Sequence, residues 1–345
     1  MNINDVIKAL KEYDGEEITL MEVCGTHTAS ISENAIPSLI SDKIHLISGP
    51  GCPVCVTVSD YVDKLIELAL DGNVIVTFGD MIRVPGSKKA LKDIKFEGAD
   101  IRMVYSPTET IELAKAEPDK NFVFAAVGFE TATPIYALLL DEIIKQKIEN
   151  VQLLTALKTM PNVIATLCES DNKIDGFIAP GHVAVITGSN AFVPLAEKYN
   201  LPFAVSGFEA EEILASIYAL IKLRRQGKVI NLYKSAVTSE RNEKAFEIVH
   251  KYFEEYDAPW RGLGIIKGSG MALKKEYAKY DAGSRELIND YSHQKGCLCG
   301  EIISGNKKPS ECPLYGKICT PENPKGACMV SIEGTCHNYI TNNRK

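Results

Sequence analysis

The sequence predicts an α/β protein, with two similar parallel-sheet α/β domains followed by a C-terminal domain that is mostly helical or irregular. Short apolar runs alternate with amphipathic helical patterns as far as about residue 225, which is typical of parallel βαβ units. Most of these runs are continuously apolar, as expected for strands covered by helices on both faces. Beyond residue 225 the alternation stops, and six of the ten cysteines lie between residues 297 and 336.

The expected strands follow this alternation along the first two domains. They cover residues 17–23, 43–49, 73–79, 101–106, 121–128, 150–156, 174–180 and 202–207. Helical patterns separate them. In residues 58–72, for example, Ser59 or Asp60 can cap the first turn and Gly72 can end the last. After residue 225 we expect a mostly helical segment that leads into a tail rich in Cys, Gly and Pro.

Three domains are predicted, over residues 1–118, 119–225 and 226–345. The first two carry similar patterns, because "ISGPGCPVCVT" is followed by "VIVTFGDMI" and "FIAPGHVAVITG" is followed by "PFAVSGFEA". An internal duplication would produce this similarity. Pro-Gly turns also recur after strands in any α/β protein, so both explanations stay open. The tail has little helical periodicity, and we expect a bound metal to order it.

The composition excludes several classes of function. Hydrophobic residues make up 45% of the chain and charged residues 24%, and the net charge of −7 indicates no basic face for a nucleic acid. No apolar run approaches the roughly 18 residues that cross a membrane. The N-terminus lacks the apolar core of a signal peptide. We therefore expect a cytoplasmic protein with no nucleic-acid or membrane partner.

Ten cysteines in a chain without a secretory signal favour metal binding or thiol redox chemistry over a disulfide framework. Cys168 is the exception, because it lies in an apolar helical pattern and is expected to be a small buried residue. Three other cysteines lie in Gly-rich turns near the N-terminus. The remaining six are in the tail: Cys297, Cys299, Cys312, Cys319, Cys328 and Cys336.

The tail cysteines have the spacing C-x-C-x12-C-x6-C-x8-C-x7-C, with no paired C-x2-C knuckles of the kind that bind structural zinc. Six thiols also exceed what one zinc ion takes. An iron–sulfur cluster takes four thiolates and leaves two cysteines that could form a redox-active disulfide beside it. The residues therefore favour an iron–sulfur domain. A zinc site and incidental thiols remain the alternatives.

Two turns near the N-terminus contain candidate functional residues. In "MEVCGTHTAS", Cys24 ends a strand and His27 follows three residues later, so the pair could share a soft metal, or His27 could simply be structural. In "GPGCPVC", Cys52 and Cys55 lie just before a predicted helix, whose dipole and free N–H groups favour thiolate. They could form a redox dithiol or be two buried thiols in an ordinary turn.

Other polar residues follow predicted strands and are expected in the same cleft, because ligands gather at the carboxyl ends of parallel strands. Each of them could instead be a helix cap. They are Asp80, Arg83, Glu130, His182 and Glu209. The glycines of "IKGSGM" are too common a pattern to indicate a phosphate site, and no Walker sequence is present.

Five segments together resemble the HypD family of [NiFe]-hydrogenase maturation proteins. They are "MEVCGTHT", "GPGCPVCVT", "VGFETATP", "APGHV" and the tail "CPLYGKICTPENPKGACMVSIEGTC", which span about residues 20–336. The resemblance implies a scaffold that works with a small partner, HypC, and on which the Fe(CN)2CO group is assembled. It also implies cyanide delivery from HypE, which HypF supplies with a carbamoyl group. A [4Fe–4S] cluster is then expected in a C-terminal domain beneath two α/β domains.

The resemblance also implies roles for individual residues. Cys24 is the expected ligand of the transient Fe(II) that carries cyanide and CO, and His27, Cys52 and Cys55 would line the same cleft. Glu130 and His182 are counted with them as candidate catalytic residues.

The tail resembles ferredoxin:thioredoxin reductase, in which a disulfide abuts the cluster. On that analogy Cys297, Cys312, Cys319 and Cys336 are cluster ligands, and Cys299 with Cys328 is the adjacent redox pair. Our hypothesis is that Cys52–Cys55 relays electrons between the cluster domain and the iron at Cys24. Two alternatives stay open. One is an iron–sulfur thiol/disulfide oxidoreductase acting on a protein disulfide, and the other is a non-catalytic scaffold.

Overall fold

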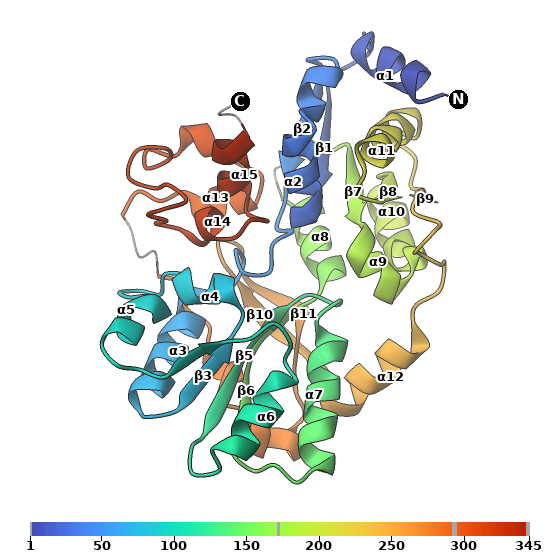
Figure 1. Cartoon of the computed structure of the whole chain (residues 1–345). Helices are drawn as coiled ribbons and strands as arrows, with labels where there is room; N and C mark the ends of the chain where they lie inside the picture. The colour runs from blue at the N-terminus through green and yellow to red at the C-terminus, as the bar shows by residue number, and fades with distance from the viewer. Residues whose placement is uncertain (1, 171–172, 292–294, 343–345) are drawn as a thin grey trace.

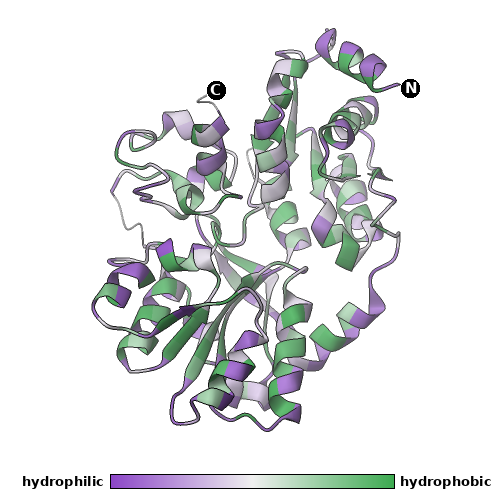
Figure 2. Cartoon of the chain, in the orientation of Figure 1, coloured by the Kyte–Doolittle hydropathy of each residue, from purple (hydrophilic) through white to green (hydrophobic). Residues whose placement is uncertain are grey.

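The computed structural model describes residues 2–170, 173–291 and 295–342. It contains a five-stranded sheet and a six-stranded sheet, each with helices packed against it. The C-terminal segment forms a third, mostly irregular region beside them (Figure 1). Figure 2 shows apolar residues concentrated along the strands and on the inner sides of the helices. The predicted α/β class is confirmed, and so is the irregular and helical character of the C-terminal region.

The first sheet is entirely parallel in the order β2-β1-β7-β8-β9. Strand β1 pairs in register with β2 from Ile18↔Ile44 to Glu22↔Ser48. The strands are β1 (Ile18–Glu22), β2 (Ile44–Ser48), β7 (Gly176–Pro180), β8 (Phe203–Ser206) and β9 (Val229–Asn231). The helices of this lobe are α1 (Ile3–Lys11), α2 (Gly25–Glu33), α9 (Gly181–Thr187), α10 (Val193–Tyr199) and α11 (Ala210–Lys222).

The second sheet has the order β10-β11-β6-β5-β3-β4. Its strands β3 to β6 are parallel, and β10 and β11 add an antiparallel hairpin at the edge. The strands are β3 (Val74–Thr77), β4 (Ile101–Met103), β5 (Phe122–Gly128), β6 (Val151–Lys158), β10 (Phe253–Trp260) and β11 (Gly264–Leu273). All seven residues of β5 are buried, which is why this run is continuously apolar.

Helices cover both faces of the second sheet. Helices α6 (Glu109–Ala116), α7 (Thr133–Lys145) and α12 (Glu243–Tyr252) pack on one face. Helices α3 (Ser59–Leu70), α4 (Gly79–Arg83) and α5 (Leu91–Phe96) pack on the other. The remaining α-helices are α8 (Met160–Cys168), α13 (Cys299–Ile303), α14 (Ala327–Val330) and α15 (Thr335–Asn342), and the 3-10 helices are Ile36–Leu39, Ser189–Phe192, Lys275–Tyr280, Ser284–Glu286 and Pro309–Glu311.

All eight predicted strands are present, but their division between sheets differs from the predicted domain order. Strands β1 and β2 pair with β7, whereas β3 and β4 lie with β5 and β6. Each sheet therefore draws on both 1–118 and 119–225, and the boundary at residue 118 does not separate them. The segment after residue 225, expected to be mostly helical, instead adds β9 to one sheet and the β10–β11 hairpin to the other.

The predicted helix over residues 58–72 is α3, but its start differs from the expected capping. Val58 is the N-cap and makes no side-chain cap. The Ser59 hydroxyl accepts a hydrogen bond from the Tyr291 N–H, and the Asp60 carboxylate accepts one from the Asn289 N–H. These side chains are therefore used to hold a distant segment against the helix.

In the described part of the chain, no helix is both long and apolar enough to cross a bilayer.

The Asp141 carboxylate joins α7 to α12 and predicts a pH-dependent stability. It accepts hydrogen bonds from Lys145, Lys251 and Tyr252, which together hold its pKa well below the usual value. A carboxyl with a lowered folded-state pKa stabilises the protein above about pH 4, and the contribution is lost as pH falls further. Asp141→Asn should therefore lower the free energy of unfolding by about 2 kcal/mol near neutral pH.

The measurement is urea unfolding of the wild type and the variant at pH 7, 5 and 3. The difference between them should shrink at pH 3. Asp119→Asn, at an exposed position, is the matched control and should change little at any pH. A difference that stays constant from pH 7 to pH 3 would contradict the electrostatic explanation.

Candidate functional site

Cys24 lies where β1 ends and α2 begins, and its backbone contacts the turn that follows β2. The Gly25 N–H donates a hydrogen bond of 2.9 Å to the Gly51 carbonyl. A Cβ atom added to Gly51 would lie 2.3 Å from the Cys24 nitrogen, so only glycine allows this approach. The "GPGC" turn is thus held directly against Cys24.

The Cys24 thiol is buried, and it is neutral in this environment. Burial, reinforced by the negative charge of Glu333, raises the pKa of Cys24 to about 12. Thiols bind metals as thiolates, so a cation at this position must displace the proton. The site is therefore suited to a cation that binds sulfur tightly, and not to free thiolate chemistry at neutral pH.

Glu22 holds the Cys24 loop in place and was not predicted. Its carboxylate is buried, accepting the Cys24 N–H at 3.0 Å and the Thr28 hydroxyl at 2.5 Å. Burial raises the pKa of Glu22 to about 7, although hydrogen bonds to Thr28 and Ser48 oppose the shift. Its place inside the expected strand of residues 17–23 carries no local sequence signal of this role.

His27 is fully buried on α2 and has one free ring nitrogen. Its Nε2 lies 2.9 Å from the Gly207 carbonyl, so this nitrogen carries the proton. The other, Nδ1, is buried and has no hydrogen-bond partner in the part of the chain that the structure describes. Burial lowers the pKa of His27 to about 4, so the ring is neutral and Nδ1 keeps a lone pair that can accept a proton or a metal.

Phe208 connects the two predicted histidines. Its ring lies 4.8 Å from that of His27 and stacks at 4.0 Å on that of His182, as measured between centroids. Although His182 is exposed as a whole, the burial of part of its side chain lowers its pKa below the usual value. Phe208 belongs to the second "GFE" segment, where only Glu209 was singled out. Glu209 itself is the N-cap of α11, which is the helix-cap alternative for that residue.

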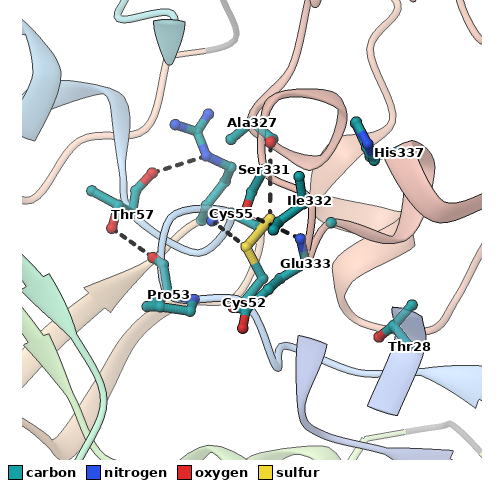
Figure 3. The surroundings of a disulfide bond; sticks show 12 residues. Thr28, Cys52, Pro53, Cys55, Thr57, Ala327, Ser331, Ile332, Glu333 and His337 are labelled. Carbon is teal, nitrogen blue, oxygen red and sulfur yellow. Dashed lines mark hydrogen bonds between the residues drawn. A yellow bond between two sulfur atoms is a disulfide. The ribbon is translucent and has the colours of Figure 1, made fainter. Parts of the chain in front are cut away.

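Cys52 and Cys55 form a disulfide that lies beside Ala327 of the C-terminal segment (Figure 3). Both residues are buried. The Cys55 sulfur is 3.8 Å from the Ala327 carbonyl, at the start of α14. The Thr57 hydroxyl donates to the Pro53 carbonyl at 2.8 Å and closes the turn before α3. The predicted pairing of these two cysteines is thus present in its oxidised form.

The C-terminal segment also reaches the Cys24 loop through Glu333. A Cβ atom added to Gly25 would lie 2.4 Å from the Glu333 Cβ, and the Thr26 hydroxyl donates to the Glu333 carboxylate at 3.2 Å. Burial raises the pKa of Glu333 above its usual value. Glu333 was not predicted, and its one sequence signal is its place in "EGTC", just before the last cysteine.

All six tail cysteines line one small cavity, together with Ile302, Tyr315, Gly326 and Met329. The thiols are close enough to shift one another's pKa, between Cys297 and Cys299, between Cys299 and Cys328 and between Cys328 and Cys336. The Lys325 N–H donates to the Cys319 sulfur at 3.3 Å. In the described part of the chain, no group of three or more His, Cys, Asp or Glu side chains is arranged as a metal site.

The donor set nevertheless suits an iron–sulfur cluster. Six sulfurs converge, and among the described residues no imidazole or carboxylate lines the cavity with them. An added Cβ on Gly326 would lie 3.0 Å from the Cys297 sulfur, so the backbone closes tightly over the thiols. The geometry does not separate four cluster ligands from a remaining pair.

Glu130 is placed apart from these residues. One carboxylate oxygen accepts the Met160 N–H at 2.7 Å, at the start of α8, and the other is buried without a partner among the residues described. Burial raises the pKa of Glu130 to about 7. Glu130 lines a cavity of about 310 Å³ with Arg241 and His250 of the α12 region. The hydrogen bond that its side chain accepts comes from α8, and within the described ranges no residue of the Cys24 loop lines this cavity.

Asp80 and Arg83 lie on α4, within the first and last turns of that short helix. The Arg83 guanidinium donates to the Pro321 carbonyl of the C-terminal segment. Cys168 ends α8 and is partly buried among apolar residues, close to the predicted role as a small apolar side chain.

Fold and site define a two-sheet α/β protein that holds a buried cysteine–histidine pair beside a disulfide and a cysteine-rich segment. The HypD family model, described as the hydrogenase formation hypA family, matches residues 1–343. The chain belongs to this family, as its motifs predicted.

Similar proteins are matched over nearly their whole length. A protein of Methanocaldococcus jannaschii whose name refers to hydrogenase expression/formation is 41% identical, with 97% of each chain covered. Hydrogenase maturation factor HypD1 of Bradyrhizobium diazoefficiens is 40% identical over 94% of this chain and 89% of the relative. Hydrogenase maturation factor HypD of Cupriavidus necator is 37% identical over 93% and 89%.

The close approach at Gly51 predicts a specific defect. Gly51→Ala places a methyl group against the Cys24 backbone and should lower the free energy of unfolding by about 1–3 kcal/mol, as overpacking does. Gly79→Ala is the matched control, because an added Cβ there meets only the end of the Met103 side chain, at 3.1 Å. Denaturant unfolding of both variants measures the effect. Equal stability of the two variants would show that the approach is not a constraint.

Proposed function

We propose that this protein matures [NiFe]-hydrogenase by serving as a scaffold on which the Fe(CN)2CO group is assembled. The observation that carries the proposal is the placement of three sets of cysteines next to one another: Cys24, the Cys52–Cys55 pair and the cysteines of the tail. Cys24 contacts the Gly51 turn, the Cys52–Cys55 disulfide follows that turn, and the disulfide contacts the cysteine-rich segment at Ala327. Membership in the HypD family supports the hydrogenase assignment.

Cys24 is the proposed ligand of the iron substrate. A thiolate is a soft ligand that can hold ferrous iron while cyanide and CO occupy other positions. Binding requires that the buried Cys24 thiol lose its proton, because its pKa is raised to about 12. His27 lies on the first turns of the helix that Cys24 caps, and its free Nδ1 is an acceptor for a proton or a second ligand for the metal.

The tail cysteines are the proposed ligands of a resident [4Fe–4S] cluster. Cys297, Cys312, Cys319 and Cys336 are assigned to the cluster, and Cys299 with Cys328 to the adjacent redox pair. The convergence of all six sulfurs on one cavity supports a sulfur-bound cofactor. When bound, such a cluster exchanges single electrons.

The Cys52–Cys55 disulfide is the proposed thiol relay of the scaffold. Two electrons and two protons convert it to two thiols, so its reduction needs a one-electron donor that acts twice or a thiol reductant that acts once. Its position between Cys24 and the cysteine-rich segment supports this role. The partners are a HypC-type small chaperone, which supplies a second cysteine ligand to the iron, and a HypE-type cyanide donor. The proposed compartment is the cytoplasm.

A second candidate is an iron–sulfur thiol/disulfide oxidoreductase that acts on a protein disulfide. The formed Cys52–Cys55 bond beside the cysteine-rich segment favours it specifically. That function needs Cys52 and Cys55 but not Cys24 or His27, and so variants at Cys24 separate the two candidates.

Infrared spectroscopy of the protein, co-expressed with its HypC-type partner and purified without oxygen, tests the scaffold function. Cyanide and carbonyl on iron absorb where protein is nearly silent, and the bands should be absent from Cys24→Ala. Cys168→Ala, which changes a cysteine at the end of α8, is the matched control and should keep them. A silent window in wild type that contains both cluster and partner would favour the oxidoreductase instead.

The relay is tested by the Cys52→Ser, Cys55→Ser double variant. It should still bind the HypC-type partner but lose most of its ability to mature hydrogenase, because no disulfide can form between two serines. Hydrogenase activity in a strain that carries only the variant is the readout, and partner binding is measured on the same preparations. Maturation at the wild-type rate would overturn the relay.

A further inference from the structure

Arg261 is a buried cation to which the site described above assigns no role. It follows β10 in the turn of the β10–β11 hairpin and is 7% exposed. Its backbone N–H donates to the Val56 carbonyl at 2.9 Å, and its Nε donates to the Thr57 carbonyl at 2.9 Å. These are the two residues directly after Cys55. Arg261 therefore holds the chain that carries the disulfide.

Arg261 also lines a cavity with two of the tail cysteines. Nη1 pairs with the Asp290 carboxylate at 3.2 Å, whereas Nη2 is buried and has no hydrogen-bond partner among the described residues. Arg261 and Asp290 line a cavity of about 60 Å³ together with Cys297 and Cys299. A buried N–H group without a partner is costly, so this donor is available to a group placed in that cavity.

The hairpin turn is held at a fixed position relative to these cysteines. Gly262 has a φ of +76°, and a Cβ atom added to it would lie 2.3 Å from the Gly300 Cα, next to Cys299. Backbone thus contacts backbone between the β10–β11 turn and α13. A rigid contact on each side keeps the guanidinium between the disulfide turn and the tail.

The charge acts on the sulfur atoms. Arg261 lines the same cavity as Cys297 and Cys299, so its positive charge lies beside these two cysteines. The same charge favours any more negative state of groups bound to these sulfurs. For an iron–sulfur cluster, net charge and hydrogen bonds to sulfur set the reduction potential.

We propose that Arg261 is a positioning residue that raises the reduction potential of the cluster held by the tail cysteines, through its buried charge and its free Nη2 donor. This inference rests on the proposed function, because it requires the cluster. Asp290 limits the effect by neutralising part of the charge. Arg261 thereby couples the cluster electrostatically to the segment that holds Cys52–Cys55.

The test is the midpoint potential of the cluster, obtained by redox titration followed by electron paramagnetic resonance on the full-length protein. Arg261→Gln removes the charge and should shift the potential to more negative values, and Arg261→Lys should shift it less. Asp290→Asn keeps the shape of the side chain but removes its negative charge, and it should shift the potential to more positive values. A purely structural role does not predict shifts of opposite sign.

Arg241→Gln, at the exposed start of the α12 region, is the matched control and should leave the potential unchanged. If Arg261→Gln does not retain the cluster, Asp290→Asn decides the question alone. A potential that is unchanged in Asp290→Asn, or that moves to more negative values, overturns the inference while leaving the proposed function intact. Wild-type protein that takes up no iron and sulfide overturns the proposed function and this inference together.

Discussion

The structure of the site depends on one close approach of two backbones, in which the turn after β2 rests on the first residues after β1. The Gly49 N–H donates to the Glu22 carbonyl at 2.7 Å, and the Gly25 N–H donates to the Gly51 carbonyl at 2.9 Å. Because β1 and β2 are parallel neighbours, both strands deliver their carboxyl ends to the same place. Cys52 is therefore fixed beside the Cys24 loop by main-chain bonds, independently of the chemistry of either sulfur.

The cysteine-rich segment gains its order by packing onto this point. Its cysteines belong to the same apolar cluster as Cys52, Cys55 and Trp260, so the tail is buried without the periodicity of a helix or strand. Polar contacts also hold it at two points, where the Thr26 hydroxyl donates to the Glu333 carboxylate and the Arg83 guanidinium donates to the Pro321 carbonyl. From the sequence alone, a bound metal is the expected source of order in this segment. In the structure, a metal cofactor would add to the order that packing already provides.

The sequence predicted the strands well because each is a locally readable apolar run that is buried on both faces. It could not predict the sheets, because the pairing of β1 with β7 joins residues more than 150 positions apart and leaves no periodic signal. The same distinction applies to the site. Cys24 and Cys52 stand in turns with distinctive local composition, whereas Phe208 and Arg261 gain their roles only from tertiary contacts.

Burial gives the site a common electrostatic character. The Cys24 thiol and the His27 imidazole are both neutral near pH 7, and the pKa of Glu22 is raised to about 7. The cause is the same for all three, because a buried environment solvates charge poorly and so favours the neutral form of each group. An arriving iron cation reverses this balance, since it stabilises a thiolate that burial otherwise disfavours. In the proposed function, iron capture and proton loss from Cys24 are therefore one coupled event. Glu22, whose carboxylate accepts the Cys24 N–H at 3.0 Å and whose pKa is raised to about 7, is placed to receive that proton in the proposed function.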